Sequence, residues 1–152
     1  TEALSTLRIE MGHVAGSELD GRTTPYDNSL EGLVSKKKDF IGKRSLTREA
    51  FTAKDRQKVV GVVPIDKKTS IPEGSHLVKD ANAPLPNPKL GYISASCWSV
   101  EHDNPFSLAI LKDGKNMIGE KLFVMSPLKN KVIPVEIVSS HYVDPKGERV
   151  RS

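Results

Sequence analysis

The chain has 152 residues, a formal net charge of +4 from 23 Lys and Arg against 19 Asp and Glu, and 37% hydrophobic residues. This length suits one domain, or one domain with a fragment of a second. No run approaches the roughly 18 apolar residues that a membrane-spanning helix needs. The first residues also lack the charged-then-apolar order of a signal peptide, so we expect neither membrane association nor secretion.

The chain has one cysteine, Cys97, which has no partner for an internal disulfide. Without a sign of export, this predicts the reducing environment of the cytoplasm. The histidines are scattered, with no spacing typical of a zinc site. A basic run, 36–38 followed by Lys43 and Arg44, has only Phe40 as an aromatic neighbour. Nucleic-acid binding needs basic residues interleaved with aromatic ones, so we do not expect it.

The first residues have the pattern of a short amphipathic helix. Leu4, Leu7 and Met11 recur at the spacing of one helix face, and Gly12 follows as a C-terminal stop. Such a short helix is marginal alone and needs a surface on which to pack. The pattern predicts a helix over residues 1–11.

The next segment is rich in Gly, Asp, Ser and Thr, so residues 12–33 are predicted to be loop and turn. A short strand is predicted at 32–35. A helix is predicted to start within 39–46, with Asp39 as its N-cap.

From Arg56 onward, apolar and β-branched runs alternate with turn signals. These runs are 59–63, 77–78, 90–93, 106–111, 122–125 and 132–138. Short strands so punctuated indicate a small antiparallel barrel or sandwich. The predicted fold class is mainly β (α+β), with a six-stranded antiparallel barrel after an N-terminal α/β arm.

Three details of the strands are also predicted. Pro134 has no N–H to donate, which places the last strand at an edge or a bulge. Asp113-Gly114 is typical of a tight turn between strands. The series Pro84-x-Pro86-x-Pro88 is interpreted as a stiff connection between strands rather than a polyproline ligand.

The residues by themselves reveal no catalytic group. There is no nucleophile elbow, P-loop or dinucleotide-binding glycine motif. Cys97 beside Trp98 could be a nucleophile, but no His lies near it in sequence, and a buried small hydrophobic residue is the more frequent role. Trp98 is interpreted as a core or interface anchor.

Ordered motifs extend this interpretation. The first set is Leu7-Arg8-Ile9-Glu10-x-Gly12, Thr23-Thr24-Pro25 and Lys36-Lys37-Lys38-Asp39-Phe40-Ile41-Gly42-Lys43. This series resembles the folate-binding aminomethyltransferase family, whose type member is the T-protein of the glycine cleavage system. The second set is Ile71–Val78, Gly91–Ser99 and Asp144-Pro145-x-Gly147-Glu148-Arg149. It is similar to the C-terminal region of the α subunits of heterotetrameric sarcosine oxidases.

The resemblance implies two domains and an enzymatic context. Residues 1–50 would be the C-terminal remnant of the folate-binding domain, and 51–152 the C-terminal β-barrel domain. In full-length sarcosine oxidases, a flavin oxidises sarcosine, and the one-carbon unit then passes to tetrahydrofolate in the folate-binding domain to give 5,10-methylenetetrahydrofolate. FAD, FMN and NAD would be bound outside this chain, whose partners would be the rest of the α subunit and the other subunits. The fragment alone is expected to be inactive.

The resemblance also assigns candidate residues for a partial tetrahydrofolate site. Glu10 matches the glutamate that grips the pterin, and a carboxylate can accept two hydrogen bonds in parallel from its N–H groups. Lys38 matches a basic position that contacts folate, often Arg in the family, and Lys lacks the bidentate guanidinium. Tyr142 is a candidate to line the same pocket, with packing against the barrel as the alternative. Asp20 and Asp27 inherit no role, because the family's catalytic aspartate lies in an earlier segment.

Two alternatives stay open at this point. The chain could come from a free-standing T-protein or from a dimethylglycine or sarcosine dehydrogenase with the same folate domain. Alternatively, the barrel could be a scaffold that seals the folate cavity and docks other subunits, since the imine intermediate hydrolyses in water.

Overall fold

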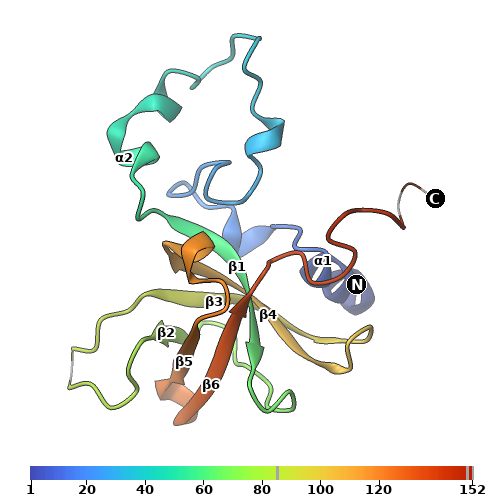
Figure 1. Ribbon diagram of the computed structural model, residues 1–152, viewed down its shortest axis with the longest axis vertical. Helices are drawn as coiled ribbons and strands as arrows, with labels where there is room; N and C mark the ends of the chain where they lie inside the picture. Colours follow the sequence, from blue (N-terminus) through green and yellow to red (C-terminus); the bar gives the residue numbers. More distant parts are fainter. Residues whose placement is uncertain (85, 150, 152) are drawn as a thin grey trace.

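The computed structural model describes residues 1–84, 86–149 and 151. Within these residues, six strands close into an antiparallel barrel in the order β1-β4-β3-β2-β5-β6. The strands are β1 (Gln57–Pro64), β2 (His76–Val78), β3 (Gly91–Ser99), β4 (Asn104–Lys112), β5 (Lys121–Ser126) and β6 (Lys131–Val138). Each predicted apolar run lies in one of these strands or overlaps it, which confirms the barrel (Figure 1). None of the described helices is long and apolar enough to cross a membrane.

The barrel interior follows the two-residue period of the strands. In β6, for example, Ile133, Val135 and Ile137 are buried, whereas the residues between them are exposed. Strand β4 is instead buried from Asn104 to Leu111. One face of β4 lines the barrel core, and the other belongs to an outer apolar cluster that contains Ile9 of the N-terminal helix. The barrel therefore offers a buried outer face on which the N-terminal segment packs.

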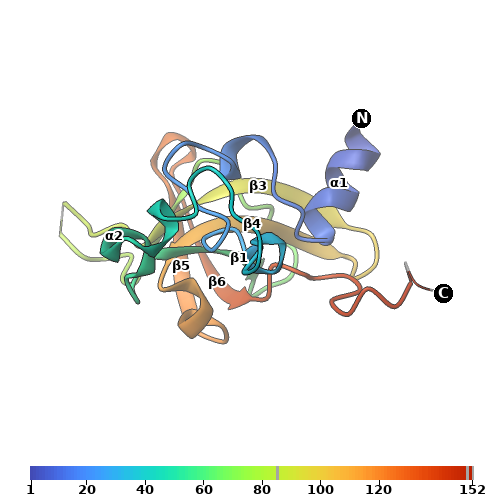
Figure 2. The same cartoon turned by 90° about the horizontal axis from the view of Figure 1, so that it is seen from above.

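Helix α1 (Glu2–Glu10) confirms the predicted N-terminal helix, and Figure 2 shows it lying beside the barrel at the β3 and β4 side. Its buried residues are Ile9 and Glu10, whereas Leu4 and Leu7 are 70% and 58% exposed. Gly12 ends the helix with φ +70°, and a Cβ at this position would lie 2.6 Å from the carbonyl oxygen of Ser140. The helix is thus anchored at its C-terminal end.

The segment between α1 and the barrel contains 3-10 turns at Gly16–Glu18, Glu31–Leu33 and Ser45–Thr47, followed by α2 (Glu49–Thr52). The strand predicted at 32–35 is wrong, because its backbone N–H groups bond locally, as from Leu33 to Leu30 and from Val34 to Glu31. The helix predicted from Asp39 is also wrong: residues 41–44 form turns, and Gly42 has φ +93°. Local turn hydrogen bonds replace regular structure here.

The strand connections differ in part from the prediction. Asp113 adopts a left-handed conformation and begins a 3-10 helix over Gly114–Met117, rather than a tight hairpin turn. A hairpin is excluded because β4 and β5 are not neighbours in the barrel. The edge or bulge expected from Pro134 is wrong, because β6 pairs with both β1 and β5 in the closed barrel, and neither pairing has a register shift among the described residues. Pro134 is tolerated because the pairing of β6 with β1 ends at Val135, next to it. In the proline series between β2 and β3, Leu85 lies outside the described residues.

Candidate functional site

Glu10 is the last residue of α1 and is only 5% exposed. Its carboxylate oxygen Oε1 accepts a hydrogen bond of 2.6 Å from the hydroxyl of Ser99, at the end of β3. Its main-chain carbonyl accepts the N–H groups of Tyr142 and Val143, each at 3.0 Å. Glu10 is therefore a buried, anchored carboxylate and not a solvated residue near a helix end.

The second carboxylate oxygen of Glu10 is differently placed. Oε2 makes no hydrogen bond to a described residue. Among the described residues, the buried side-chain nitrogen and oxygen atoms without a partner are Asn28 Oδ1 and Ser75 Oγ, and Oε2 is not one of them. Oε2 therefore keeps contact with solvent. Glu10 holds one oxygen inside the protein and presents the other at the surface.

Tyr142 lies beside Glu10, since its backbone N–H bonds the Glu10 carbonyl. Its ring stacks on Phe106 of β4, with centroids 4.3 Å apart and planes 2° from parallel. The Tyr142 hydroxyl accepts a hydrogen bond from Asn104 Nδ2 at 3.0 Å. His102 is a second aromatic neighbour, and its ring centroid lies 4.2 Å from that of Tyr142. These contacts are those of packing against the barrel, the alternative that the sequence had left open for Tyr142.

Lys38 lies in a different part of the structure, in the segment between β1 and α1 that projects from the barrel (Figure 1). It is exposed, and its ammonium group has no hydrogen bond or ion pair to a described residue. It lines a cavity of about 930 Å³ together with Tyr26, Phe40 and Leu46, and with the further basic residues Lys36, Lys37 and Lys43. The lining thus combines apolar and aromatic side chains with four lysines and one carboxylate, that of Glu31.

The structure thus brings together two of the three predicted site residues. Glu10 and Tyr142 are hydrogen-bonded neighbours. None of the cavities found among the described residues that contain Lys38 is lined by Glu10 or Tyr142. The assignment of Lys38 to the same pocket therefore remains a prediction.

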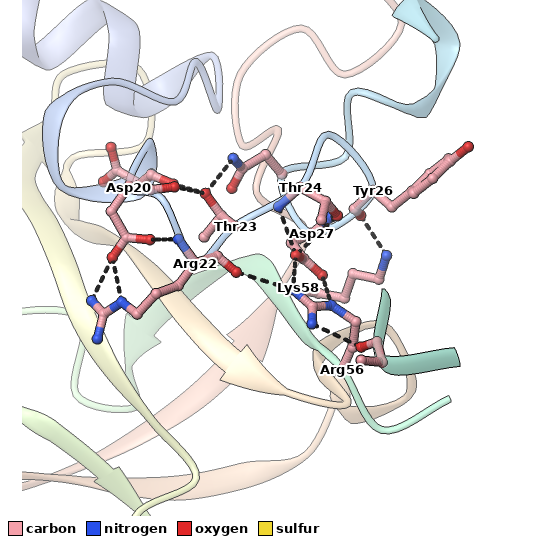
Figure 3. Close-up of polar contacts among 11 residues, drawn as sticks. Asp20, Arg22, Thr23, Thr24, Tyr26, Asp27, Arg56 and Lys58 are labelled. Atoms are coloured by element: carbon pink, nitrogen blue, oxygen red, sulfur yellow. Dashed lines mark hydrogen bonds and ion pairs between the residues drawn. The ribbon is translucent and has the colours of Figure 1, made fainter. Parts of the chain in front are cut away.

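A buried ion pair holds the base of the projecting segment (Figure 3). Asp27 is 1% exposed, and its carboxylate accepts hydrogen bonds from Arg56, including one from Nε at 2.7 Å. The backbone N–H and the hydroxyl of Thr24 donate to the same carboxylate at 2.8 and 3.0 Å. Arg56 also donates to the carbonyl oxygens of Ala50 and Arg22, at 3.0 and 3.1 Å. This network ties residues on both sides of the projecting segment to the start of β1.

The charges of this pair stabilise each other. Burial raises the pKa of Asp27, but the hydrogen bonds from Arg56 and Thr24 outweigh burial and hold the pKa below its usual value. The hydrogen bond with Asp27 raises the pKa of Arg56. Asp20, by contrast, pairs with Arg22 at the surface (Figure 3). Sequence reasoning assigned no role to Asp27, and in the structure it anchors the arm to the barrel.

Cys97 has the environment of an inert thiol. Burial, together with the charge of Glu10, raises the pKa of Cys97 to about 11. A thiol with this pKa is almost fully protonated at neutral pH, which disfavours nucleophilic catalysis. Trp98 is 48% exposed, so it is no core anchor. The described residues contain no group of three or more His, Cys, Asp and Glu side chains that could hold a metal ion.

Comparison with known proteins gives relatives of two kinds. No protein-family model matches the chain. Sarcosine oxidase subunit alpha of Rhizobium meliloti (strain 1021) is 41% identical over 151 residues, which are 98% of this chain and 15% of that protein. Sarcosine oxidase subunit alpha of Corynebacterium sp. (strain U-96) is 38% identical over 152 residues, 98% of this chain and 16% of that protein. A probable mitochondrial aminomethyltransferase of Schizosaccharomyces pombe is 23% identical over 147 residues, 93% of this chain and 35% of that protein.

The fold has a counterpart among solved structures. Glycine cleavage system aminomethyltransferase T from Bartonella henselae superimposes with a TM-score of 0.67 at 20% identity, over 94% of this chain and 38% of that chain. At this identity, the likeness concerns the fold. The chain spans about one sixth of the length of the α subunits that it matches. These findings confirm the resemblance seen in the motifs: the chain is a homologue of the C-terminal region of sarcosine oxidase α subunits, and its fold is similar to that of the matched part of the aminomethyltransferase.

Proposed function

We propose that the chain works within a sarcosine oxidase α subunit and forms one wall of a tetrahydrofolate site. There, the one-carbon unit from oxidised sarcosine would become 5,10-methylenetetrahydrofolate. The observation that carries this proposal is the state of Glu10, a buried carboxylate held by Ser99 with one oxygen left at the surface. A buried carboxylate is costly unless its hydrogen bonds are satisfied, and a ligand with N–H donors would complete them.

The chemistry of the pterin suits this carboxylate. The ring N–H and the exocyclic amino group form an edge with two donors. Oε2 of Glu10 is free to accept one of them, and Oε1 has a further lone pair besides the one that accepts from Ser99. Hydrogen bonds to an ionised group are roughly twice as strong as neutral ones. The role of Glu10 in this proposal is to bind and orient the pterin.

Lys38 is proposed to meet the opposite, anionic end of the folate molecule. Its cavity combines the aromatic rings of Tyr26 and Phe40 with several lysines. Such a surface attracts carboxylates and packs against an apolar body. Tyr142 contributes by packing that keeps the main chain of Glu10 in place.

In this proposal, the chain has no turnover alone. The FAD, FMN and NAD sites would lie outside it, and the partners would be the rest of the α subunit and the other subunits of the enzyme. The relatives named sarcosine oxidase are 36–41% identical to the chain, against 23–26% for those named aminomethyltransferase. This difference favours the sarcosine oxidase context over a free-standing T-protein.

Binding of folinic acid to the complete enzyme, measured by isothermal titration calorimetry, tests the assignment. Glu10→Gln keeps the size of the side chain but replaces an acceptor by a donor. We expect a loss of about 1.5–3 kcal/mol, or roughly ten- to a hundredfold in affinity. Lys38→Met should weaken binding, because it removes the cation proposed to meet the anionic end of the folate. The control variant Lys129→Met, at an exposed turn before β6, should leave the affinity unchanged. Unchanged affinity in Glu10→Gln would remove the pterin contact from the proposal.

A second candidate function is structural, and exposed apolar side chains at the end of β3 favour it. Trp98 is 48% and Val100 81% exposed, on the hairpin that leads to β4. Side chains of this kind are typical of surfaces that dock another protein segment. If docking is the main role, Trp98→Ser combined with Val100→Ser should impair assembly in size-exclusion chromatography, with Glu10→Gln as an assembly-neutral control. Normal assembly of the double variant would contradict the structural role.

A further inference from the structure

Ser99 is a fully buried hydroxyl at the end of β3, and its two hydrogen bonds point in defined directions. Its Oγ donates to Oε1 of Glu10 at 2.6 Å, since an ionised carboxylate can only accept. The same Oγ accepts the backbone N–H of His102 at 3.3 Å. With its acceptor side occupied by His102, the hydroxyl hydrogen is directed at the carboxylate.

The contacts around Glu10 form a closed ring. The imidazole Nε2 of His102 donates a hydrogen bond to the carbonyl oxygen of Tyr142 at 3.1 Å. The N–H of Tyr142 donates in turn to the carbonyl oxygen of Glu10 at 3.0 Å. This closed set of hydrogen bonds therefore links the end of α1, the hairpin between β3 and β4, and the segment after β6. It fixes Glu10 at both its main chain and its carboxylate.

A side chain held in this way loses little conformational freedom when a ligand binds. A free glutamate at a helix end has several rotamers, and ordering such a side chain on binding costs conformational entropy. Because Ser99 donates to Oε1, the position of this oxygen is set in advance, and Oε2 keeps contact with solvent. Preorganisation of this kind favours binding without any contact between the positioning group and the ligand.

We infer that Ser99 is a positioning residue of the folate site, and that the hairpin between β3 and β4 orients the pterin-binding carboxylate of Glu10. This inference rests on the proposed function of Glu10. The barrel domain thereby takes part in ligand binding through Ser99, rather than only closing the cavity. The ligand class is a heterocycle that presents two adjacent N–H donors.

A double-mutant cycle in the complete enzyme tests the inference, with folinic acid affinity and the KM for tetrahydrofolate as readouts. Ser99→Ala removes only the hydroxyl and is expected to weaken binding on the order of tenfold. In the Glu10→Gln background, Ser99→Ala is expected to add no further loss, because its effect acts through Glu10. The matched control is Ser96→Ala on the same strand, whose hydroxyl bonds Ser107 at 2.9 Å.

The outcomes separate this inference from the proposed function. If Glu10→Gln leaves binding unchanged, the folate assignment of Glu10 fails, and the inference fails with it. If Glu10→Gln weakens binding but Ser99→Ala does not, the inference alone is overturned. Equal losses for Ser99→Ala in both backgrounds would show a general structural effect and would also overturn it. A melting temperature measured for each variant checks that the fold is retained.

Discussion

Replacing Arg56 by methionine removes the guanidinium that neutralises a buried carboxylate. Asp27 is 1% exposed, and the Arg56 side chain is 18% exposed. Removing one partner of a buried ion pair typically costs about 3–5 kcal/mol, because the other charge stays buried without compensation. The donors of Thr24 remain on the carboxylate in the variant. We therefore expect the lower end, about 3 kcal/mol.

The matched control is Arg22→Met. Arg22 pairs with Asp20 in the same region, but its side chain is 80% exposed. Exposed ion pairs contribute about 0–1 kcal/mol, so this variant should be close to the parent protein. Urea unfolding followed by circular dichroism measures both. For a chain of this size, about 3 kcal/mol corresponds to a fall in melting temperature of roughly 6–12 °C.

The pH dependence gives an independent check of the same pair. The pKa of Asp27 is lowered from its usual 3.8 in the folded state. The pair therefore stabilises the fold fully above that value, and its contribution is lost as the pH falls through the folded-state pKa. The difference in unfolding free energy between the parent and Arg56→Met should be constant near neutral pH and shrink in acid. Equal stability losses for Arg56→Met and Arg22→Met near neutral pH would refute the reasoning.

Two further predictions concern Cys97 and Tyr142. The pKa of Cys97 is raised from 9.0 to about 11. Its thiolate fraction near pH 8 should therefore be roughly a hundredfold below that of an unperturbed thiol. If a thiol-specific disulfide reagent labels Cys97 as fast as it labels glutathione, this prediction is contradicted. Tyr142→Phe keeps the stack on Phe106 and loses only the bond with Asn104, so it should cost about 1 kcal/mol in urea unfolding. Tyr142→Ala loses the stack as well and should cost about 3 kcal/mol; similar losses for the two variants would show that the stack contributes little.

The strands and the first helix could be predicted from the sequence because their signals are local. In β6, the alternation of Ile133, Val135 and Ile137 with exposed residues is readable without knowledge of the partner strands. The helix α1 was likewise predicted from periodicity, with Gly12 as its end. The apolar face of this helix is covered only in part, since Leu4 and Leu7 are exposed. Which face of a helix is covered depends on what lies against it.

The candidate site could be predicted only as single residues. The resemblance pointed to Glu10 through its motif, but nothing in the sequence pairs it with Ser99, which is 89 positions away. The ion pair between Asp27 and Arg56 spans 29 positions and was not foreseen. The boundary predicted near residue 50 remains a prediction, with the first strand beginning at Gln57.

The sequence by itself determined where apolar runs, turns and family motifs occur, since periodicity and turn chemistry depend on neighbours along the chain. Only the tertiary structure decided the order of strands in the barrel, the burial of Glu10 beside Ser99 and the separation of Glu10 from the cavity of Lys38. The physical reason is that a buried charge is placed by hydrogen bonds from distant segments. Those bonds form only when the closed barrel brings α1, the hairpin after β3 and the segment after β6 together.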